Sequence, residues 1–326
     1  MKCHWLQTTN EVIISVDDLH KTFSNKVEAV KGISLAINRG EIFGLLGPNG
    51  AGKSTTINMI VGLLEPNSGT VSIYGEKIKA RSKIVKEKVG IIPQELIMWQ
   101  FLTVEENLHF LADIYKVPKQ ISKERIDKLI KKIHLEEKKK ELVKNLSGGL
   151  KRRLNIIMAL VHDPEIIICD EPTPGLDPQS RLLVWDFLEE LCKQQGKTLI
   201  LTTHFMDEAD HLSDRIAIMD NGKLLVMNTA EELKNSLGKG DILEFNINDT
   251  TKSEELRKGL NNYDETLNII TLGEIVIIRG LGLIQKIPSI LNKVEEFNLT
   301  ISDMKIRKTT LEDVFIDLTG KQLREE

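Results

Sequence analysis

The spacing of apolar residues in the first fifth of the chain predicts strands followed by a helix. Residues 11–16 and 33–37 alternate or run apolar as strands do, and Ile42–Gly47 is a short apolar run typical of a buried strand. From Ser54 onward the period becomes that of a helix, which Pro66 ends. The apolar residues of this helix are Ile57, Ile60, Val61 and Leu64. Several glycines separate the buried strand from the helix.

Helical periods dominate the stretch from Thr103 to Leu146. Thr103 is predicted as a helix N-cap, because Glu106 follows three residues later and completes a capping box. Ser122 is predicted to begin a second helix. The apolar face of that second helix consists of Ile126, Leu129, Ile130 and Ile133.

Strand-like runs return at residues 165–170, 197–204 and 214–226 and alternate with helical segments. This order predicts an α/β fold with a mostly parallel sheet that helices cover on both faces. The pattern changes near residue 240, after which strands are predicted within 241–248, 266–280 and 301–307, and helices near 252–260 and 284–297. We therefore expect a boundary near Lys239, between domains 1–238 and 239–326.

Composition narrows the class of protein. The chain has 326 residues, of which 41% are hydrophobic and 28% are charged, as in a soluble protein with two domains. The formal net charge of -4 does not favour binding to nucleic acid or to an acidic membrane surface. No apolar run reaches the length of about 20 residues that spans a bilayer, and no signal peptide is expected. Cys3, Cys169 and Cys192 are too widely spaced for a zinc site or disulfide framework and fit a reducing cytosol.

The glycines after the buried strand belong to a phosphate-binding motif. Residues 47–54 match G-x-x-x-x-G-K-[ST] between a strand and a helix. Backbone N–H groups of such a loop point at phosphate oxygens, and glycine leaves room for them. Lys53 is expected to reach the β- and γ-phosphates, and the Ser54 hydroxyl to ligate Mg²⁺. The predicted ligand is a nucleoside triphosphate, held by Gly47, Pro48, Asn49, Gly50, Ala51, Gly52, Lys53, Ser54 and Thr55.

Two carboxylates end the apolar run "EIIICDEP". The carboxyl end of a strand in an open α/β sheet is where ligands bind. Asp170 is expected to hold Mg²⁺, directly or through water. Glu171 is expected to polarise the attacking water as a general base.

The segment "NLSGGLKRRLNIIMAL" at residues 145–160 resembles the signature motif of ATP-binding cassette (ABC) proteins, and Ser147 precedes Asp170 by 23 residues as in that family. Six motifs follow the family's order over residues 11–230. They are Gly47–Thr55, Gln94 in "GIIPQE", Ser147-Gly148-Gly149, Asp170-Glu171, "GLD" at 175–177 and His204. The resemblance implies a P-loop NTPase core with a mostly parallel sheet, an antiparallel β subdomain and a helical subdomain over about residues 95–150. A small α+β C-terminal domain would follow this core.

The resemblance also implies roles for single residues, with ATP as the nucleotide. Phe23 would stack on adenine. Gln94 would sense Mg²⁺ and the γ-phosphate and connect to the helical subdomain. His204 would hydrogen-bond the γ-phosphate and hold Glu171 and the water in line, and Asp177 would lie at a dimer interface.

The signature segment is a second candidate anion site. Ser147 is a good N-cap, and Gly148 and Gly149 leave backbone amides exposed at the start of a helix. In the family, two ATPase domains pack head to tail, and each signature faces the γ-phosphate that the other chain holds. A homodimer, or a dimer with a sister ATPase subunit, would therefore complete two sites.

Two residues depart from the family's pattern. Leu150 stands where many members have Gln, although the branch that resembles drug exporters commonly has an apolar residue there. Pro174 occupies a position that is usually small or polar, and we have no account of its consequence.

The segment "TLEDVFIDLTGK" at residues 310–321 resembles the end of ATPase subunits of the daunorubicin-resistance (ABC-2) exporter type. No catalytic constellation is visible between residues 240 and 326. Dimer stabilisation, regulation and simple packing are the roles considered for this part.

The resemblance implies an ATP-hydrolysing subunit of a membrane transporter of the exporter type, peripheral on the cytoplasmic face of the membrane. It would drive a separate multi-span permease without contacting the cargo, which the sequence does not name. A candidate docking surface for the permease lies near Gln94, where Glu95, Trp99 and Phe101 follow.

Two other classes of protein also contain a phosphate-binding loop of this kind. A soluble cassette ATPase that acts on ribosomes or DNA is the alternative, but such proteins usually carry two cassettes, long coiled coils or zinc insertions. This sequence has one cassette, no CxxC and no basic tail. A GTPase or kinase is disfavoured by the signature segment and by the absence of a guanine-reading motif.

Overall fold

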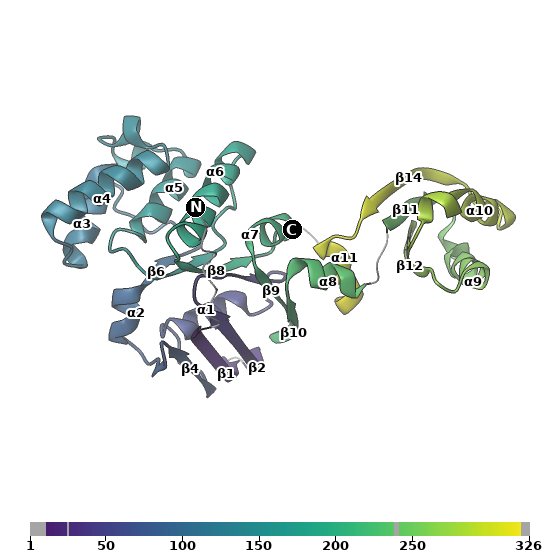
Figure 1. Cartoon of the computed structure of the whole chain (residues 1–326), viewed down its shortest axis with the longest axis horizontal. Coiled ribbons are helices and arrows are strands. Elements are labelled where there is room, and N and C mark those ends of the chain that lie inside the picture. Colours follow the sequence, from purple (N-terminus) through teal and green to yellow (C-terminus); the bar gives the residue numbers. More distant parts are fainter. Residues whose placement is uncertain (1–10, 25, 238–240, 321–326) are drawn as a thin grey trace, which may run out of the picture. The chain divides into compact units, whose positions relative to one another are not determined.

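The structure is a computed structural model that describes residues 11–24, 26–237 and 241–320. The chain divides into two compact units, Met1–Thr229 and Ala230–Glu326 (Figure 1). The predicted domain boundary near Lys239 lies outside the described residues.

A six-stranded sheet forms the centre of the first unit. All neighbouring strands in it are parallel except β10, which pairs antiparallel with β9. The spatial order of the strands is β10 (Lys223–Asn228), β9 (Arg215–Asp220), β3 (Ile42–Leu46), β8 (Thr198–Thr203), β7 (Ile166–Asp170) and β6 (Val89–Ile92). The mostly parallel α/β sheet expected from the sequence is therefore confirmed.

The strand-like run 214–226 is a hairpin rather than one strand. Asn221 and Gly222 separate β9 from β10 and have φ angles of 48° and 79°. Two consecutive positive φ angles are typical of the tight turn that reverses a two-residue hairpin. The run therefore ends the sheet with an antiparallel edge strand.

Both faces of the central sheet are covered, because alternate residues of β7 belong to different cores. Ile167 and Cys169 pack in a core shared with the helices α3 (Val104–Ile114), α4 (Lys119–Lys132), α5 (Gly148–Met158) and α6 (Pro178–Lys193). Ile166 and Ile168 pack on the other side, in a core that includes α1 (Lys53–Ile60). Figure 1 shows α6 and α1 on opposite sides of the sheet.

An antiparallel sheet encloses the second of these cores. Its strands lie in the order β2 (Glu28–Asn38), β1 (Val12–Thr22), β4 (Ser68–Ile73) and β5 (Glu76–Lys77). Alternating residues of β1 such as Ile14 and Val16 are buried against the α1 side of the central sheet. A short helix, α2 (Lys83–Lys88), leads from this part to β6.

The helical part confirms one predicted helix start and corrects another. Thr103 caps α3 and forms the predicted capping box with Glu106. The second helix begins at Lys119, with Pro118 at its N-cap, and not at Ser122. The Ser122 side chain is buried inside the helix, where its hydroxyl donates to the Lys119 carbonyl. A serine that satisfies its hydroxyl in this way is compatible with a helix interior.

The second unit is a small α+β structure. Its antiparallel sheet has the order β12 (Asn268–Leu272), β13 (Ile275–Gly280), β11 (Asp241–Ile247) and β14 (Ile301–Lys308). The helices α9 (Ser253–Tyr263) and α10 (Leu283–Glu296) share one apolar core with this sheet. The unit begins with α8 (Ala230–Ser236), and its last described helix is α11 (Leu311–Thr319).

A buried ion pair attaches α11 to this sheet. Arg307 on β14 donates to both carboxylate oxygens of Asp313, at 2.6 and 2.8 Å, and the Asp313 side chain is 1% exposed. Asp313 also completes a capping box with Thr310. Burial opposes ionisation of Asp313, but hydrogen bonds from Arg307 and Thr310 outweigh burial and lower its pKa.

We expect Asp313→Asn to destabilise the second unit by about 3 kcal/mol at pH 7, because the buried Arg279 and the half-buried Arg307 each lose an anionic partner. Since the folded-state pKa is lowered, the stabilisation is present above the unfolded value of about 3.9 and is lost as the pH falls through the folded value. Hydrogen exchange of β13 and β14 in the full chain measures this effect. Asp303→Asn, at an exposed position of β14, is the control. Equal protection in both variants would contradict the assigned role.

Candidate active site

The phosphate-binding motif forms a loop that only glycine can build at two positions. It joins the end of β3 to α1, which begins at Lys53. Gly52 has φ of 101°, and a Cβ there would lie 2.4 Å from the Ala29 carbonyl oxygen. A Cβ on Gly47 would lie 2.3 Å from the Met219 carbonyl oxygen. The loop is therefore pressed against neighbouring backbone, and larger residues would displace it.

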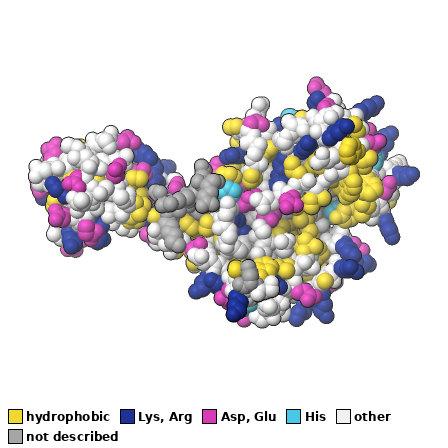
Figure 2. Space-filling view, turned by 180° about the vertical axis from the view of Figure 1, so that it is seen from behind, with side chains coloured by type: hydrophobic (Ala, Val, Ile, Leu, Met, Phe, Trp, Pro, Cys, Tyr) yellow, Lys and Arg dark blue, Asp and Glu magenta, His cyan; other side chains and the backbone are white. Residues whose placement is uncertain are grey.

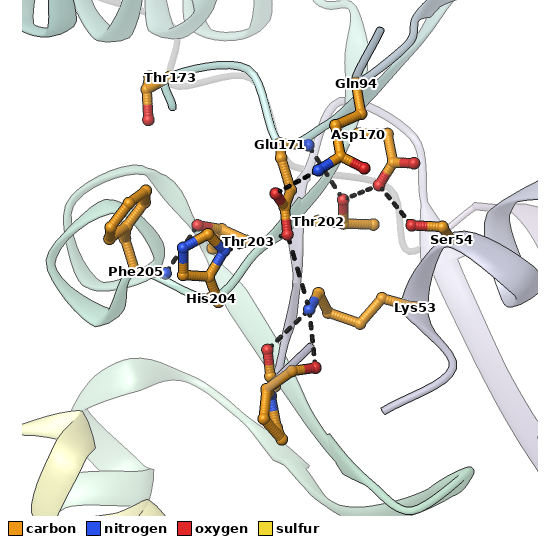
Figure 3. Close-up of polar contacts among 12 residues, drawn as sticks. Lys53, Ser54, Gln94, Asp170, Glu171, Thr173, Thr202, Thr203, His204 and Phe205 are labelled. Atoms are coloured by element: carbon orange, nitrogen blue, oxygen red, sulfur yellow. Dashed lines mark hydrogen bonds and ion pairs between the residues drawn. The ribbon is translucent and has the colours of Figure 1, made fainter. Parts of the chain in front are cut away.

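Lys53 is folded into this loop and is 5% exposed. Its Nζ donates to the carbonyl oxygens of Gly47, at 2.7 Å, and of Pro48, at 3.1 Å (Figure 3). The same Nζ lies 3.8 Å from Oε1 of Glu171. Burial lowers the pKa of Lys53, although Glu171 and Asp170 oppose that shift. A buried cation that bonds only to carbonyls of its own loop is ready to exchange them for phosphate oxygens.

Asp170 and Ser54 bring together two oxygen atoms that could ligate a metal ion. The Ser54 hydroxyl donates to Oδ1 of Asp170 at 3.1 Å, and the Thr202 hydroxyl donates to the same oxygen. The described part of the chain has no cluster of three or more His, Cys, Asp or Glu residues suited to a metal ion. Mg²⁺ in nucleotide sites is held by one or two carboxylates together with substrate phosphates, so a hydroxyl and one carboxylate fit it.

Glu171 is held from two sides. Nε2 of Gln94 donates to Oε2 of Glu171 at 3.0 Å, and Nδ1 of His204 lies 3.0 Å from Oε1 (Figure 3). The Glu171 backbone N–H donates to the carbonyl of Thr202 at 3.1 Å. The carboxylate is therefore fixed between Gln94, His204 and Lys53 with 6% of the residue exposed.

The backbone of Glu171 is strained. Its φ is 50°, in the left-handed region that residues with a side chain rarely adopt. Such a conformation costs on the order of 1–3 kcal/mol and persists where the surroundings determine it. The strain occurs at the residue on which Gln94, His204 and Lys53 converge.

The signature segment forms a separate, outward-facing helix start. Ser147 caps α5 by accepting from the Leu150 N–H at 3.4 Å, and Ser147 and Gly148 are exposed. A Cβ on Gly148 would meet nothing within 4 Å, and one on Gly149 would meet only Leu176, at 3.6 Å. The first turn of α5 thus leaves open space beside its amides within this chain.

Two other predicted site residues lie apart from the Lys53–Glu171 cluster. Asp177 is exposed and caps α6, where its carboxylate accepts from the Ser180 N–H at 2.9 Å. Hydrogen bonds from Ser180 lower the pKa of Asp177. Phe23 is 39% exposed, and its ring centroid lies 5.7 Å from Nζ of Lys21. The adenine-stacking and interface roles of these residues stay predictions.

The two departures from the family's pattern lie in different surroundings. Leu150 is half-buried and packs against the core of the helical part. Pro174 is half-buried in the loop that leads from Glu171 to Asp177. Nothing in the structure explains why proline stands there.

Sequence analysis missed Thr202 and Arg152. Thr202 lies directly beside Asp170 in the parallel register of β7 and β8, so its hydroxyl reaches Oδ1. The alternation of strands and helices predicts that 165–170 and 197–204 share a sheet, and adjacent carboxyl ends would have pointed to Thr202. Arg152 is one of three consecutive basic residues, Lys151–Arg153, and the sequence pattern does not distinguish it from its neighbours.

Comparison with known proteins finds related chains of one family. The profile of the "ABC transporter" family matches residues 30–174. The linearmycin resistance ATP-binding protein LnrL of Bacillus subtilis (strain 168) is 35% identical over 315 residues, which cover 96% of this chain and 100% of the relative. Nod factor export ATP-binding protein I of Rhizobium sp. (strain N33) is 36% identical over 324 residues, covering 96% of this chain and 99% of the relative.

Solved structures give the same result for the fold. The structure of an ATP binding subunit of an ABC transporter matches with a TM-score of 0.64 and 29% identity, covering 69% of this chain and 93% of the other. A dimeric ATP-binding cassette in a post-hydrolysis state, bound to ADP and Pi, matches with a TM-score of 0.62 and 28% identity, covering 67% and 98%.

Proposed function

The chain belongs to the ABC transporter family as an ATP-binding subunit of the export type, and we propose that it hydrolyses ATP to drive a separate membrane-embedded subunit. The relatives named for linearmycin resistance and for Nod factor export support export as the direction. No helix among the described residues is long and apolar enough to cross a membrane. The proposed partner is therefore a separate permease, with this chain bound at its cytoplasmic face.

The observation that carries hydrolysis is the convergence of Gln94, His204 and Lys53 on the Glu171 carboxylate. In the proposed reaction Glu171 accepts a proton from the water that attacks the γ-phosphate. Gln94 and His204 would orient the carboxylate, and His204 would also donate to a γ-phosphate oxygen. Positioned bases of this kind contribute about 10²–10⁴-fold to rate.

Lys53 and the loop amides would bind the phosphates and stabilise the charge that develops on them. Ser54 and Asp170 would hold Mg²⁺. Gln94 is hydrogen-bonded to Glu171, the residue that follows Asp170. A bound Mg²⁺ would neutralise negative charge on the β- and γ-phosphates. ATP and Mg²⁺ are thus the proposed substrate and cofactor.

A head-to-tail dimer completes each site in this proposal. Lys53 of the phosphate loop lies beside Glu171, while Ser147 and Gly148 begin a separate helix and are exposed. A second copy, or a sister ATPase subunit, would place its signature amides on the γ-phosphate. An N-terminal helix turn with exposed glycines is suited to that contact. Asp177 would then lie at the interface.

An exposed apolar surface lies beside Gln94 and is the proposed docking surface for the permease. Figure 2 shows hydrophobic side chains gathered over the helical part of the first unit. Phe101 is 79% exposed, and the Trp99 ring packs edge-on against Phe110 with centroids 4.4 Å apart. The Asn107 side chain fixes the Trp99 backbone, because it accepts from the Trp99 N–H and donates to the Trp99 carbonyl. The exposed apolar residues of this docking surface are Leu96, Ile97, Trp99, Phe101, Phe110 and Ile114. A fixed apolar patch of this kind indicates a protein or membrane contact.

We expect the double variant Trp99→Ala, Phe101→Ala to reduce recovery of the chain with membranes at least about tenfold, because exposed aromatic anchors dominate such contacts. ATP hydrolysis by the purified chain should change less than about twofold, since neither ring touches Glu171. Leu281→Ala with Ile284→Ala, two exposed apolar residues of the second unit, is the matched control. Full membrane recovery of the first variant would show that another surface docks.

The proposed function is tested by purifying the tagged chain from mildly solubilised membranes of its host and identifying what accompanies it. A multi-span membrane protein that is lost with the Trp99 and Phe101 variant supports the proposal. Ribosomal proteins or nucleic acid recovered from the soluble fraction would instead support a soluble cassette ATPase.

A further inference from the structure

Arg152 lies inside the first unit, and all three nitrogens of its guanidinium group donate hydrogen bonds to backbone carbonyls. The residue is 5% exposed and belongs to α5, the helix that the signature segment begins. Its Nε donates to the carbonyl of Pro172 at 2.8 Å. Its Nη1 donates to the carbonyls of Pro93, at 2.8 Å, and Gln94, at 3.0 Å. Its Nη2 donates to the carbonyls of Asp170, at 3.3 Å, and Glu171. All five N–H donors of the side chain thus have a carbonyl partner.

These five carbonyls belong to the two loops that form the active site. One loop carries Gln94, and the other carries Asp170 and Glu171. Arg152 bridges them from a third element, so the Gln94–Glu171 side-chain bond of 3.0 Å is backed by a shared backbone anchor. Asn155, one turn further along α5, adds a bond to the Pro93 carbonyl at 3.3 Å.

A second buried charged residue, Glu208, holds the loop that follows Glu171. Glu208 on α7 (Met206–Leu212) is 0% exposed and accepts from the Thr173 hydroxyl at 2.8 Å. The Trp185 Nε1–H donates to the same carboxylate oxygen at 3.0 Å. Arg152 therefore fixes residues 170–172, and Glu208 fixes the next residue. The strained backbone of Glu171, with φ of 50°, lies within the part that Arg152 holds.

We propose that Arg152 is a positioning residue for ATP hydrolysis, which fixes Glu171 and Gln94 of its own chain to the signature helix. This inference rests on the proposed function and deepens it. In a head-to-tail dimer, the signature of one chain contacts the ATP whose hydrolysis the other chain's Glu171 assists. Arg152 then carries any movement of α5 upon that contact to the Glu171 of its own chain, at the opposite site. The two sites are thereby connected through α5.

Lysine cannot replace this group, because an ammonium offers three donors from one atom and lacks the planar fork of a guanidinium. A purely structural role would reduce stability and ATP binding together. A positioning role lowers kcat while ATP binding persists, since a displacement of about 1 Å in a catalytic group can cost on the order of 10²-fold.

The first experiment compares Arg152→Met, Arg152→Lys and Lys151→Met in the full chain. Lys151 is the neighbouring cation on α5, half-buried, with one bond of 3.3 Å to the Lys144 carbonyl, and is the matched control. We expect kcat to fall about 100-fold in Arg152→Met and about tenfold in Arg152→Lys, with KM for ATP within about threefold. Lys151→Met should keep the wild-type rate. Equal rates in the Met variants at 151 and 152 would overturn the inference.

The second experiment separates an effect on Glu171 from an effect on the signature. Mixed dimers are assembled with Glu171→Gln in one protomer, so that a single Glu171 remains. With Arg152→Met in the protomer that keeps Glu171, we expect activity to fall about 100-fold. With Arg152→Met in the protomer that carries Glu171→Gln, activity should stay within about twofold of the single-Glu171 dimer. The reverse pattern would show that Arg152 serves the signature contact instead.

Two further measurements distinguish a positioning role of Arg152 from a role in stability, and this inference from the proposed function. Arg152→Met in the Glu171→Gln background should still form an ATP-dependent dimer, and loss of that dimer together with a lowered Tm would assign Arg152 to stability alone. Absence of ATP hydrolysis by the wild-type chain would contradict the proposed function itself. An unchanged rate in Arg152→Met beside an active wild type would overturn only this inference.

Discussion

Glu171→Gln is expected to lower the rate of ATP hydrolysis at least about 100-fold and to leave an ATP-bound dimer that does not turn over. Glutamine has nearly the same shape as glutamate, so its carbonyl can accept from Gln94. Its amide can face Nδ1 of His204, which accepts in one neutral tautomer. The variant therefore keeps the hydrogen bonds to Gln94 and His204 and loses the base together with its negative charge.

Binding of ATP should improve rather than weaken in this variant. Oε1 of Glu171 lies 3.8 Å from Nζ of Lys53. In the proposed site its negative charge would also face the γ-phosphate that Lys53 binds. Removing that charge relieves repulsion with the phosphate. Phosphate release measures hydrolysis, and light scattering with and without ATP measures the dimer.

Glu124→Gln is the control, because Glu124 is an exposed glutamate on α4 whose only described ion pair is with Lys128. It should hydrolyse ATP at the wild-type rate. Rapid turnover in Glu171→Gln would show that a different group accepts the proton from water.

The sequence predicted the elements that carry the site, because these strands are buried on both faces. Such strands are continuous apolar runs, and the run that ends at Asp170 shows where the strand stops. The phosphate loop, Asp170, Glu171 and His204 all follow strands of one parallel sheet, and the carboxyl ends of such strands meet at one edge. Their convergence follows from that topology.

The supporting contacts could not be predicted in the same way. Lys151, Arg152 and Arg153 are three consecutive basic residues, and only the orientation of α5 determines which of them enters the interior. A charged residue is expected at the surface unless the fold supplies partners. The carbonyls that bind Arg152 come from segments 18 to 59 residues away along the chain.

Local sequence signals misplaced the start of one helix, α4, and did not show where the strand-like run 214–226 divides. Ser122 has the residue type of an N-cap, but Pro118 already turns the chain, and α4 starts at Lys119, ahead of Ser122. In the run 214–226, Asn221 and Gly222 interrupt an otherwise regular pattern. The direction of β10 depended on the turn that these two residues form.

Lys53→Ala is expected to weaken ATP binding about 10- to 100-fold, which makes it the largest loss of affinity available from one side chain of the site. A hydrogen bond to a charged group contributes about 1.5–3 kcal/mol, and Lys53 is the one buried cation of the phosphate loop. Without ATP, its ammonium group bonds to the carbonyls of Gly47 and Pro48. Exchange of these partners for phosphate oxygens replaces neutral acceptors with anionic ones, which form stronger bonds.

Burial of Lys53 strengthens this expectation. Removal from water lowers the pKa of Lys53, and the carboxylates of Glu171 and Asp170 oppose that shift. A buried cation interacts with phosphate more strongly than an exposed one, because less water screens it. Binding of a fluorescent ATP analogue in the Glu171→Gln background measures affinity without hydrolysis. Lys83→Ala, which removes an exposed lysine with 85% side-chain exposure, is the charge control. If Lys53→Ala bound the analogue as tightly as Lys83→Ala does, the loop amides alone would account for phosphate binding, and Lys53 would act only in the transition state.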